Sequence, residues 1–333
     1  MTNETKKIAL IFGGMGKEHS VSVAGAKYVR GVIDSRKYSV IPVYITEDGE
    51  WILTEGEGRR TFPVGIGGRH GLLLDGEVLS IHCAIPLLHG DFGEDGKIQG
   101  ALEVAGIPFV GADTVTGAVC IDKGYTGAIA ASLGIPIARG VTVSRGTPER
   151  DALRAAEEIG FPVFLKPTRL GSSVGASLAQ TREDFPSAYE VAAKAGTSVL
   201  IEELIRPKRE LEVGILLTGK STVISPVGEV LCDGFYSFER KYRTGTKTVC
   251  RADIDKRDSD TLRAWALTLA RALEVRGTAR IDFFKSGDRL LFNEINTMPG
   301  FTEDSLYPRL MAESGISPTR LFDLLIEDAV GEE

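Results

Sequence analysis

Paired cysteines and long apolar runs are both absent from this chain of 333 residues. The four cysteines are dispersed without a Cys-x-x-Cys pair, which argues against a zinc site and favours buried free thiols. No apolar run approaches the roughly 18 residues that a membrane helix needs, and the polar N-terminus is unlike a signal peptide. We therefore expect a soluble, cytoplasmic protein without a membrane partner.

Positive charge is also scarce. The chain has 39 Lys and Arg against 46 Asp and Glu, so its net charge is −7, and no basic block stands out. Proteins that bind nucleic acid usually carry a basic patch, so we expect no nucleic-acid partner. The composition, 43% hydrophobic and 26% charged, is that of a globular protein, and the length suggests two or three domains.

Two common phosphate-binding motifs are missing. The sequence has no G-x-x-x-x-G-K-[ST], and Gly13-Gly14-Met15-Gly16 is not a complete G-x-G-x-x-G. Residues 171–175 match G-x-S-x-G, but every histidine lies before residue 90, whereas a hydrolase of that type needs its histidine after the serine. With Lys166 nearby, the segment is either a phosphate-binding loop containing Ser172 and Ser173 or a plain connector.

Apolar runs alternate with helical patterns in the first third of the chain. We expect strands at 8–12, 38–45 and 81–88, and helices at 98–105 and at 21–33, the latter with Ser20 as its cap. This alternation predicts a small doubly wound α/β domain over residues 1–111. An α+β domain over 112–204 should follow, and residues 205–333 should combine strands with a long helix at 259–273 and a last helix at 318–330.

The most informative segment is a pair of expected strands near the C-terminus, 280–282 and 293–296, joined by a turn near 286–288. Strand side chains alternate between faces, so with a three-residue loop Asp282 faces Glu294 and Arg280 faces Asn296. Paired carboxylates without a basic partner repel, and a divalent cation with oxygen ligands, Mg²⁺ or Mn²⁺, would offset that repulsion. The alternative is a solvated hairpin with scattered charges.

Three other polar features could belong to a site. Residues 89–100 are rich in glycine and acids and follow a strand, although Asp95 could simply cap a helix. Glu18, at a strand-to-helix crossing, could hold an ammonium group or be a surface acid near a helix N-terminus. The polar stretch at about 233–250 is either a lid over a site or a mobile surface loop.

Taken together, these motifs resemble the D-alanine–D-alanine ligase family, ATP-grasp enzymes of peptidoglycan synthesis. The likeness runs over nearly the whole chain, and the most specific segments are His89 to Gly100, of the form HGxxGEDGxxQG, and Asn293 to Phe301, of the form NExNTxPGF. The resemblance implies an ATP-grasp fold with α/β and α+β parts that hold ATP between the last two domains. It also implies two Mg²⁺ or Mn²⁺ ions and a homodimer.

The resemblance assigns roles residue by residue. Asp282, Glu294 and Asn296 match the metal ligands, and Glu18 matches the acid that holds the ammonium of the first D-alanine. Arg280 and the Gly300 N–H are candidates for stabilising an oxyanion, and Ser305 with Leu306 falls where the second D-alanine binds. The remaining matches are to residues of the nucleotide site, the substrate site and a mobile loop: Lys123, Lys166, Ser172, Ser173, Glu202, Glu210, His89, Lys241 and Tyr242.

The implied reaction phosphorylates one D-alanine to an acyl phosphate, which the amine of a second D-alanine attacks. Leu306 and the pair Lys241-Tyr242 favour D-alanine as the second substrate over D-serine or D-lactate, which related vancomycin-resistance ligases use. Glu303 and Asp304 depart from the family pattern and would weaken a carboxylate pocket unless they point outward. The alternatives are another ATP-grasp carboxylate–amine ligase and a nucleotide-binding regulator without turnover.

Overall fold

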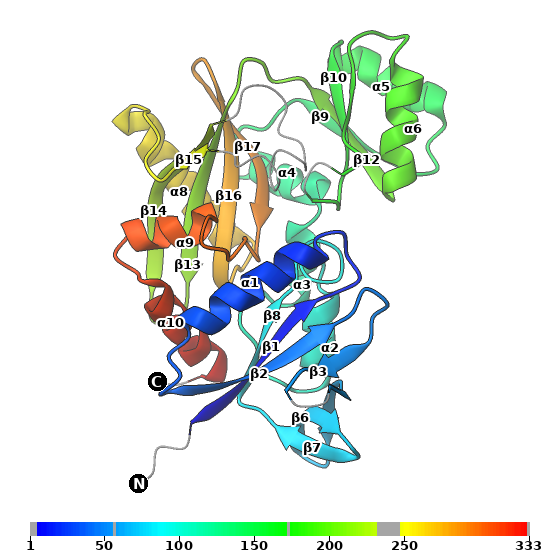
Figure 1. The fold of residues 1–333 in the computed structure, drawn as a ribbon. Helices are drawn as coiled ribbons and strands as arrows, with labels where there is room; N and C mark the ends of the chain where they lie inside the picture. The colour runs from blue at the N-terminus through cyan, green and yellow to red at the C-terminus, as the bar shows by residue number, and fades with distance from the viewer. Residues whose placement is uncertain (1–4, 56–57, 172–173, 232–246, 332–333) are drawn as a thin grey trace.

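The computed structural model describes residues 5–55, 58–171, 174–231 and 247–331. Its strands form four sheets, and helices cover the faces of the larger three (Figure 1). The two sheets formed within residues 6–87 lie at one end of the molecule. The sheets formed by residues 140–203 and by residues 209–296 lie side by side at the other end (Figure 1). No helix among the described residues is long and apolar enough to cross a membrane.

The first sheet has the order β4-β3-β2-β1-β8 and is parallel at its centre, where β1 pairs with β2 and β8. Helices α1 and α10 pack on one face and α2 on the other, as in a doubly wound domain. The elements are β1 (Lys6–Gly13), α1 (His19–Val32), β2 (Tyr38–Ile45), β3 (Trp51–Leu53), β4 (Arg59–Arg60), β8 (Cys83–Leu87), α2 (Lys97–Val104) and α10 (Pro318–Val330).

Two details of this first part differ from expectation. Three further strands, β5 (Pro63–Ile66), β6 (Arg69–Leu74) and β7 (Glu77–Ser80), form a separate antiparallel sheet that the sequence did not predict. Ser20 is not the cap of α1: Glu18 holds that position, and its side chain makes no capping hydrogen bond. The helix begins at His19, whose ring Nδ1 lies 2.6 Å from the Gly14 carbonyl oxygen.

The second sheet, β11-β10-β12-β9, is antiparallel, with α5 and α6 packed together against it. Helices α3 and α4 precede it and pack instead toward the third sheet, in the core around β13 and β16. These elements are α3 (Thr114–Cys120), α4 (Lys123–Ser132), β9 (Gly140–Ser144), α5 (Glu149–Ile159), β10 (Val163–Pro167), β11 (Ser177–Ala179), α6 (Phe185–Ala195) and β12 (Ser198–Glu203).

The third sheet, β15-β14-β13-β16-β17, is also antiparallel and carries α8 on one face and α9 on the other. Its elements are β13 (Arg209–Leu217), β14 (Thr222–Leu231), β15 (Lys247–Val249), α8 (Lys256–Ala272), β16 (Gly277–Ser286), β17 (Arg289–Asn296) and α9 (Leu306–Glu313). Helix α10 then returns to the first sheet and shares its core. The division into 1–111, 112–204 and 205–333 stays a prediction, because the chain passes between cores more than once.

The β16–β17 hairpin has the predicted residue pairing, but its turn is shorter than expected and one strand contains a bulge. Asp282 pairs with Glu294 and Arg280 with Asn296, as expected. The loop, however, has two residues rather than three, because Ser286 pairs directly with Arg289. A β-bulge that leaves Asn293 unpaired supplies the extra residue, so both acids still face the same side of the sheet.

Candidate active site

Glu18 is placed by the junction between β1 and α1. Ser22, one turn into the helix, accepts a hydrogen bond from the Gly13 N–H at 2.8 Å and donates to the Leu87 carbonyl, which fastens α1 to the ends of β1 and β8. The Glu18 carboxylate then lies against two glycines. A Cβ added to Gly90, whose φ is +65°, would come within 2.4 Å of Glu18 Oε2, and one on Gly171 within 3.4 Å.

Glu94 is a residue to which the sequence assigned no role. Its carboxylate accepts hydrogen bonds from the Gly90 N–H at 2.8 Å and from the Met298 N–H at 3.3 Å. It therefore links the loop after β8 to the loop after β17. Burial and the nearby charge of Glu18 raise the pKa of Glu94 to about 7, against the opposing effect of its two N–H partners and Arg280.

His89 strengthens the same link. The sequence placed it among the substrate-binding residues, and the structure puts its Nδ1 atom 3.1 Å from the Met298 carbonyl oxygen. Glu94 and His89 thus contact the N–H and the carbonyl of one residue, midway between Asn296 and Gly300. Asp95 is not the cap of α2, a position that Gly96 occupies; its carboxylate accepts from the Phe92 and Lys97 N–H groups instead.

Lys123 and Lys166 reach the same region from two other elements. The Lys123 ammonium donates to the Leu170 carbonyl at 3.0 Å and pairs with Glu294 at 3.1 Å. The Lys166 ammonium pairs with Glu202 at 2.8 Å and donates to Asn293 Oδ1 at 3.1 Å. Lys166 and its partner Glu202 are both about nine-tenths buried, so the Lys166 ammonium is held in place and poorly screened by solvent.

Asp122, the N-cap of α4, ties Lys123 to the loop after β10. Its Oδ1 accepts from the Gly124 and Tyr125 N–H groups, and its Oδ2 accepts from Thr168 Oγ1 at 3.2 Å and Arg169 Nε at 2.8 Å. The sequence assigned no role to Asp122. Its four partners fix the start of the helix that carries Lys123 to the loop that continues through Gly171.

The acids of the hairpin have basic partners, contrary to expectation. Arg280 Nε and Nη2 donate to both carboxylate oxygens of Asp282 at 2.8 Å, and Arg280 also pairs with Glu212 at 3.1 Å. Burial alone would lower the pKa of Arg280, but Asp282 and Glu212 outweigh it and hold that pKa well above its usual value. Repulsion between unpaired acids is therefore not the argument for a metal here.

The oxygen donors of the hairpin still suit a hard cation. Asp282 and Glu294 lie opposite each other, and the Asn296 amide contacts Asp282 Oδ2 at 3.1 Å. Among the residues that the structure describes, no three acidic, histidine or cysteine side chains converge on one point. Two carboxylates and one amide fit Mg²⁺, which usually takes its other ligands from water and substrate phosphates.

The loop after β17 places Gly300 beside Ser305. A Cβ on Gly300 would come within 3.0 Å of Ser305 Oγ. Leu306, the first residue of α9, is buried, and it lies near Gly228 of β14. Glu303 and Asp304 are exposed, so they point outward as a carboxylate pocket would need.

Glu210 is the other predicted position among the described residues, and no contact described above joins it to this cluster. Glu210 pairs with Lys208 at 2.9 Å, and Lys208 also lies over the Phe284 ring. Ser172, Ser173, Lys241 and Tyr242 fall outside the described residues, as does most of the stretch at 233–250.

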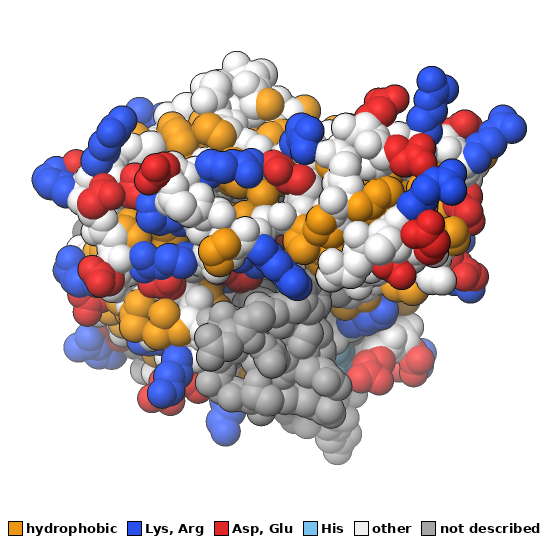
Figure 2. Space-filling model, turned by 90° about the horizontal axis from the view of Figure 1, so that it is seen from above, with side chains coloured by type: hydrophobic (Ala, Val, Ile, Leu, Met, Phe, Trp, Pro, Cys, Tyr) orange, Lys and Arg blue, Asp and Glu red, His pale blue; other side chains and the backbone are white. Residues whose placement is uncertain are grey.

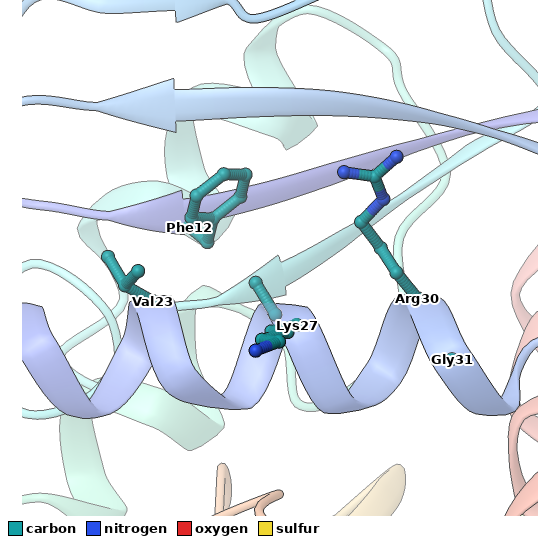
Figure 3. Close-up of a pocket in the computed structure, with 6 residues that line it drawn as sticks. Phe12, Val23, Lys27, Arg30 and Gly31 are labelled. Atoms are coloured by element: carbon teal, nitrogen blue, oxygen red, sulfur yellow. The ribbon is translucent and has the colours of Figure 1, made fainter.

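A cavity of about 490 Å³ lies elsewhere, beside α1 and the Phe12 side chain of β1 (Figure 3). Phe12 and Val23 line it together with Lys27 and Arg30. None of the predicted site residues lines this cavity, so it is separate from the cluster described above.

Seen from above, acidic and basic side chains are interspersed on the surface (Figure 2).

Family comparisons agree with this geometry. A model described as the D-ala D-ala ligase N-terminus matches residues 7–64 and 68–112, and one described as the D-ala D-ala ligase C-terminus matches 129–327. A D-alanine--D-alanine ligase of Mycolicibacterium gilvum (strain PYR-GCK) is 37% identical, with 98% of each chain covered. The chain belongs to the D-alanine–D-alanine ligase family.

Other family members are similar over the same length. The D-alanine--D-alanine ligase of Mycobacterium tuberculosis (strain CDC 1551 / Oshkosh) is 36% identical, covering 97% of this chain and 95% of its own. Among solved structures, the VanG D-Ala:D-Ser ligase from Enterococcus faecalis has a TM-score of 0.89 at 32% identity, covering 98% and 100%. The D-alanine-D-alanine ligase from Coxiella burnetii has a TM-score of 0.88 at 28% identity, covering 98% and 94%. The chain has the ATP-grasp fold of these ligases.

Proposed function

We propose that this protein joins two D-alanine molecules into D-alanyl-D-alanine, with ATP as the phosphate donor, for peptidoglycan synthesis. The observation that carries the proposal is the match to curated D-alanine--D-alanine ligases over 98% of the chain. The geometry supports it, because cations from two elements, Lys123 and Lys166, meet the acid-bearing hairpin at one place.

The chemistry explains why such a site needs several cations. A carboxylate is a poor acyl donor, because an oxide ion would have to leave. Transfer of the terminal phosphoryl group of ATP to the first D-alanine gives an acyl phosphate and ADP, and phosphate can then leave when the second amine attacks. Lys123 and Lys166 would neutralise the phosphate charge, while Glu18 would hold the ammonium of the first D-alanine.

The attack creates a tetrahedral oxyanion, for which we propose the Gly300 N–H and Arg280 as donors. The Nε–Nη2 edge of Arg280 is engaged by Asp282, so a contact with the oxyanion would come from the remaining N–H groups on Nη1 and Nη2. The Gly300 N–H follows the loop that Glu94 and His89 anchor at Met298. Ser305, beside Gly300, would bind the carboxylate of the second D-alanine, with Leu306 next to it.

Asp282, Glu294 and Asn296 are the proposed ligands of two Mg²⁺ or Mn²⁺ ions. Bound there, the ions would offset negative charge on the transferred phosphoryl group. The resemblance further suggests that Ser172, Ser173, Lys241 and Tyr242 close over the reactants, that Glu202 and Glu210 lie near the nucleoside, and that the protein is a cytoplasmic homodimer of three domains. Closure would keep water from the acyl phosphate.

The second candidate product is D-alanyl-D-serine. The observation in its favour is the structural similarity to VanG, described as a D-Ala:D-Ser ligase, whose chain is covered completely. The sequence favours D-alanine through Leu306, and D-lactate is disfavoured by the Lys241-Tyr242 pair. The two candidates share the first half of the reaction and differ only in the amine that attacks.

A competition assay tests the function. The protein is incubated with ATP, Mg²⁺ and equal amounts of D-alanine, D-serine and D-lactate, and the products are resolved by mass. We expect D-alanyl-D-alanine with release of ADP and phosphate. A separate incubation with L-alanine in place of these substrates should give no product. Absence of phosphate release at saturating concentrations of all three substrates would refute both candidates, whereas a D-serine product would favour the second candidate.

The metal assignment has a test of its own. Replacing Asp282 with Asn removes a carboxylate from the proposed ligand set and should lower the rate by about a hundredfold or more. The rate should also require more MgCl₂ to reach its maximum. Asp288→Asn, in the exposed turn of the same hairpin, serves as the control. Unchanged Mg²⁺ dependence in Asp282→Asn would exclude Asp282 as a ligand.

A further inference from the structure

The Ser305 hydroxyl is held by a turn that precedes α9. The Thr302 N–H donates to Ser305 Oγ at 2.9 Å, the two hydroxyl oxygens lie 2.8 Å apart, and the Ser305 N–H donates back to the Thr302 carbonyl at 3.1 Å. Ser305 is the N-cap of α9, yet its side chain makes no capping hydrogen bond to the helix. Its hydroxyl is turned toward Thr302 instead of toward the helix N–H groups.

A count of hydrogen bonds limits what this hydroxyl can do. A serine hydroxyl has one hydrogen to donate and can accept two hydrogen bonds. The Thr302 N–H already uses one of the two acceptor positions. If Ser305 donated to Thr302 Oγ1, no hydrogen would remain for a third partner; if Thr302 donates, both acceptor positions are used and the Ser305 hydrogen is available.

The proposed function places a third partner of Ser305 Oγ on the side of Gly300. Ser305 Oγ is close enough to Gly300 that an added Cβ would lie 3.0 Å away, and Gly300 follows the loop of Asn296. A carboxylate has no hydrogen to donate and can only accept. A carboxylate bound at this place therefore requires Ser305 as the donor, which in turn requires Thr302 to donate to Ser305.

We propose that Thr302 is a positioning residue for the amine substrate: its hydroxyl donates to Ser305 Oγ and thereby directs the Ser305 hydrogen toward the substrate carboxylate. The proposal rests on the proposed function, which places that carboxylate at Ser305. Two incoming hydrogen bonds polarise the Ser305 hydroxyl and make it a better donor. Thr302 acts through Ser305 and does not itself touch the substrate.

Two substitutions separate the hydroxyl of Thr302 from its shape. Thr302→Val has nearly the same shape and keeps the backbone N–H that bonds Ser305, but loses Oγ1. Thr302→Ser keeps Oγ1. For the Val variant we expect the concentration of D-alanine needed for half-maximal dipeptide formation to rise about fivefold, the size of one lost hydrogen bond between neutral groups, because the Ser305 hydroxyl is no longer oriented and polarised by Thr302. The Ser variant should remain within about twofold of the original protein on the same scale.

The first half of the reaction is the internal control. Hydroxylamine traps an acyl phosphate as a hydroxamate, so hydroxamate formation from ATP and D-alanine reports on the first half without the second amine. This rate and the KM for ATP should be unchanged in Thr302→Val. In a Ser305→Ala background, Thr302→Val should have no further effect, because the residue through which it acts is gone.

The outcomes distinguish the two levels of proposal. If the unmodified protein makes no dipeptide, the proposed function is refuted. If it makes dipeptide and Thr302→Val leaves the half-maximal D-alanine concentration unchanged, or raises the KM for ATP equally, the role of Thr302 is refuted. Circular dichroism confirms folding, and Thr302→Ala replaces the Val variant if that variant does not fold.

Discussion

At the scale of single residues, contacts between positions far apart in the chain hold the charged groups of the site in place. Lys166 donates to Asn293, and Arg280 pairs with Glu212. Glu94 accepts a hydrogen bond from the Met298 N–H, 204 residues later. Because these partners come from different elements, a change in one side chain is expected to act on several parts of the site.

Glu94 gives a prediction about pH. Its pKa in the folded protein is raised to about 7, above the ordinary value of 4.5, so the folded state binds this proton more tightly than the unfolded state. The stability gained from this proton is full below about pH 4.5 and is lost as pH rises through about 7. Replacing Glu94 with Gln removes the titrating proton, so the decline in the free energy of unfolding over that range should become shallower.

The measurement is urea denaturation of both proteins from pH 5 to pH 8. The difference in slope should approach the one-proton limit of about 1.4 kcal/mol per pH unit in the middle of the range. Glu77→Gln, on the exposed surface of β7, controls for loss of one acid and should leave the slope unchanged. Parallel curves for Glu94→Gln and the original protein would show that Glu94 does not titrate in this range.

At the scale of elements, long regular segments were predicted well and short irregular ones poorly. Strand β2 and helix α10 begin and end as expected, because each has a clear apolar pattern and a proline or polar boundary. The strands of 51–80 were missed because they have two to six residues and are largely half-buried or exposed. In the hairpin, a bulge made up for a turn that is one residue shorter than expected, and sequence periodicity cannot distinguish these two routes.

The start of α4 yields a prediction at this scale. Replacing Asp122 with Asn keeps an oxygen for the helix cap but puts an N–H₂ group where Thr168 and Arg169 now donate. The helix should persist while the loop through Gly171 loses its two side-chain contacts with position 122. We expect the KM for ATP to rise by about tenfold, as for loss of a charged hydrogen bond, and the half-maximal D-alanine concentration to change less.

A neighbouring cap provides the control. Asp113 caps α3 through the Thr116 N–H and makes no contact with the ATP-side loop in the interactions described. Asp113→Asn should therefore leave the KM for ATP unchanged. An equal rise in both variants would mean that helix stability, rather than the connection of Asp122 to Thr168 and Arg169, controls nucleotide binding.

At the scale of the whole molecule, the two ends of the chain are held together by one core. Helix α10 packs with α1 and β1, and Asp323 of α10 pairs with Lys37, just before β2, at 2.7 Å. Asp323 is about nine-tenths buried whereas Lys37 is half-exposed. The fold class was predictable from the alternation of strands and helices, but the return of α10 to the first sheet was not, because no local pattern specifies a contact between positions 37 and 323.

The Lys37–Asp323 ion pair can be compared with a surface ion pair that has a similar N–O distance. Asp323→Asn removes a buried charge partner and should lower the free energy of unfolding by about 1–3 kcal/mol, the usual range for a hydrogen bond to a charged group. Asp75→Asn breaks the Arg59–Asp75 pair, which has the same type of contact at 2.8 Å but is half-exposed or more on both sides, and should cost less than about 1 kcal/mol. Urea midpoints measure both. Because Asp323 joins the last helix to the first sheet, its loss should also lower the midpoint reported by Trp51 fluorescence in a Trp265→Phe background, and by more than Asp75→Asn does. Equal costs for the two variants would mean that the buried pair adds nothing to the shared core beyond what a surface pair adds.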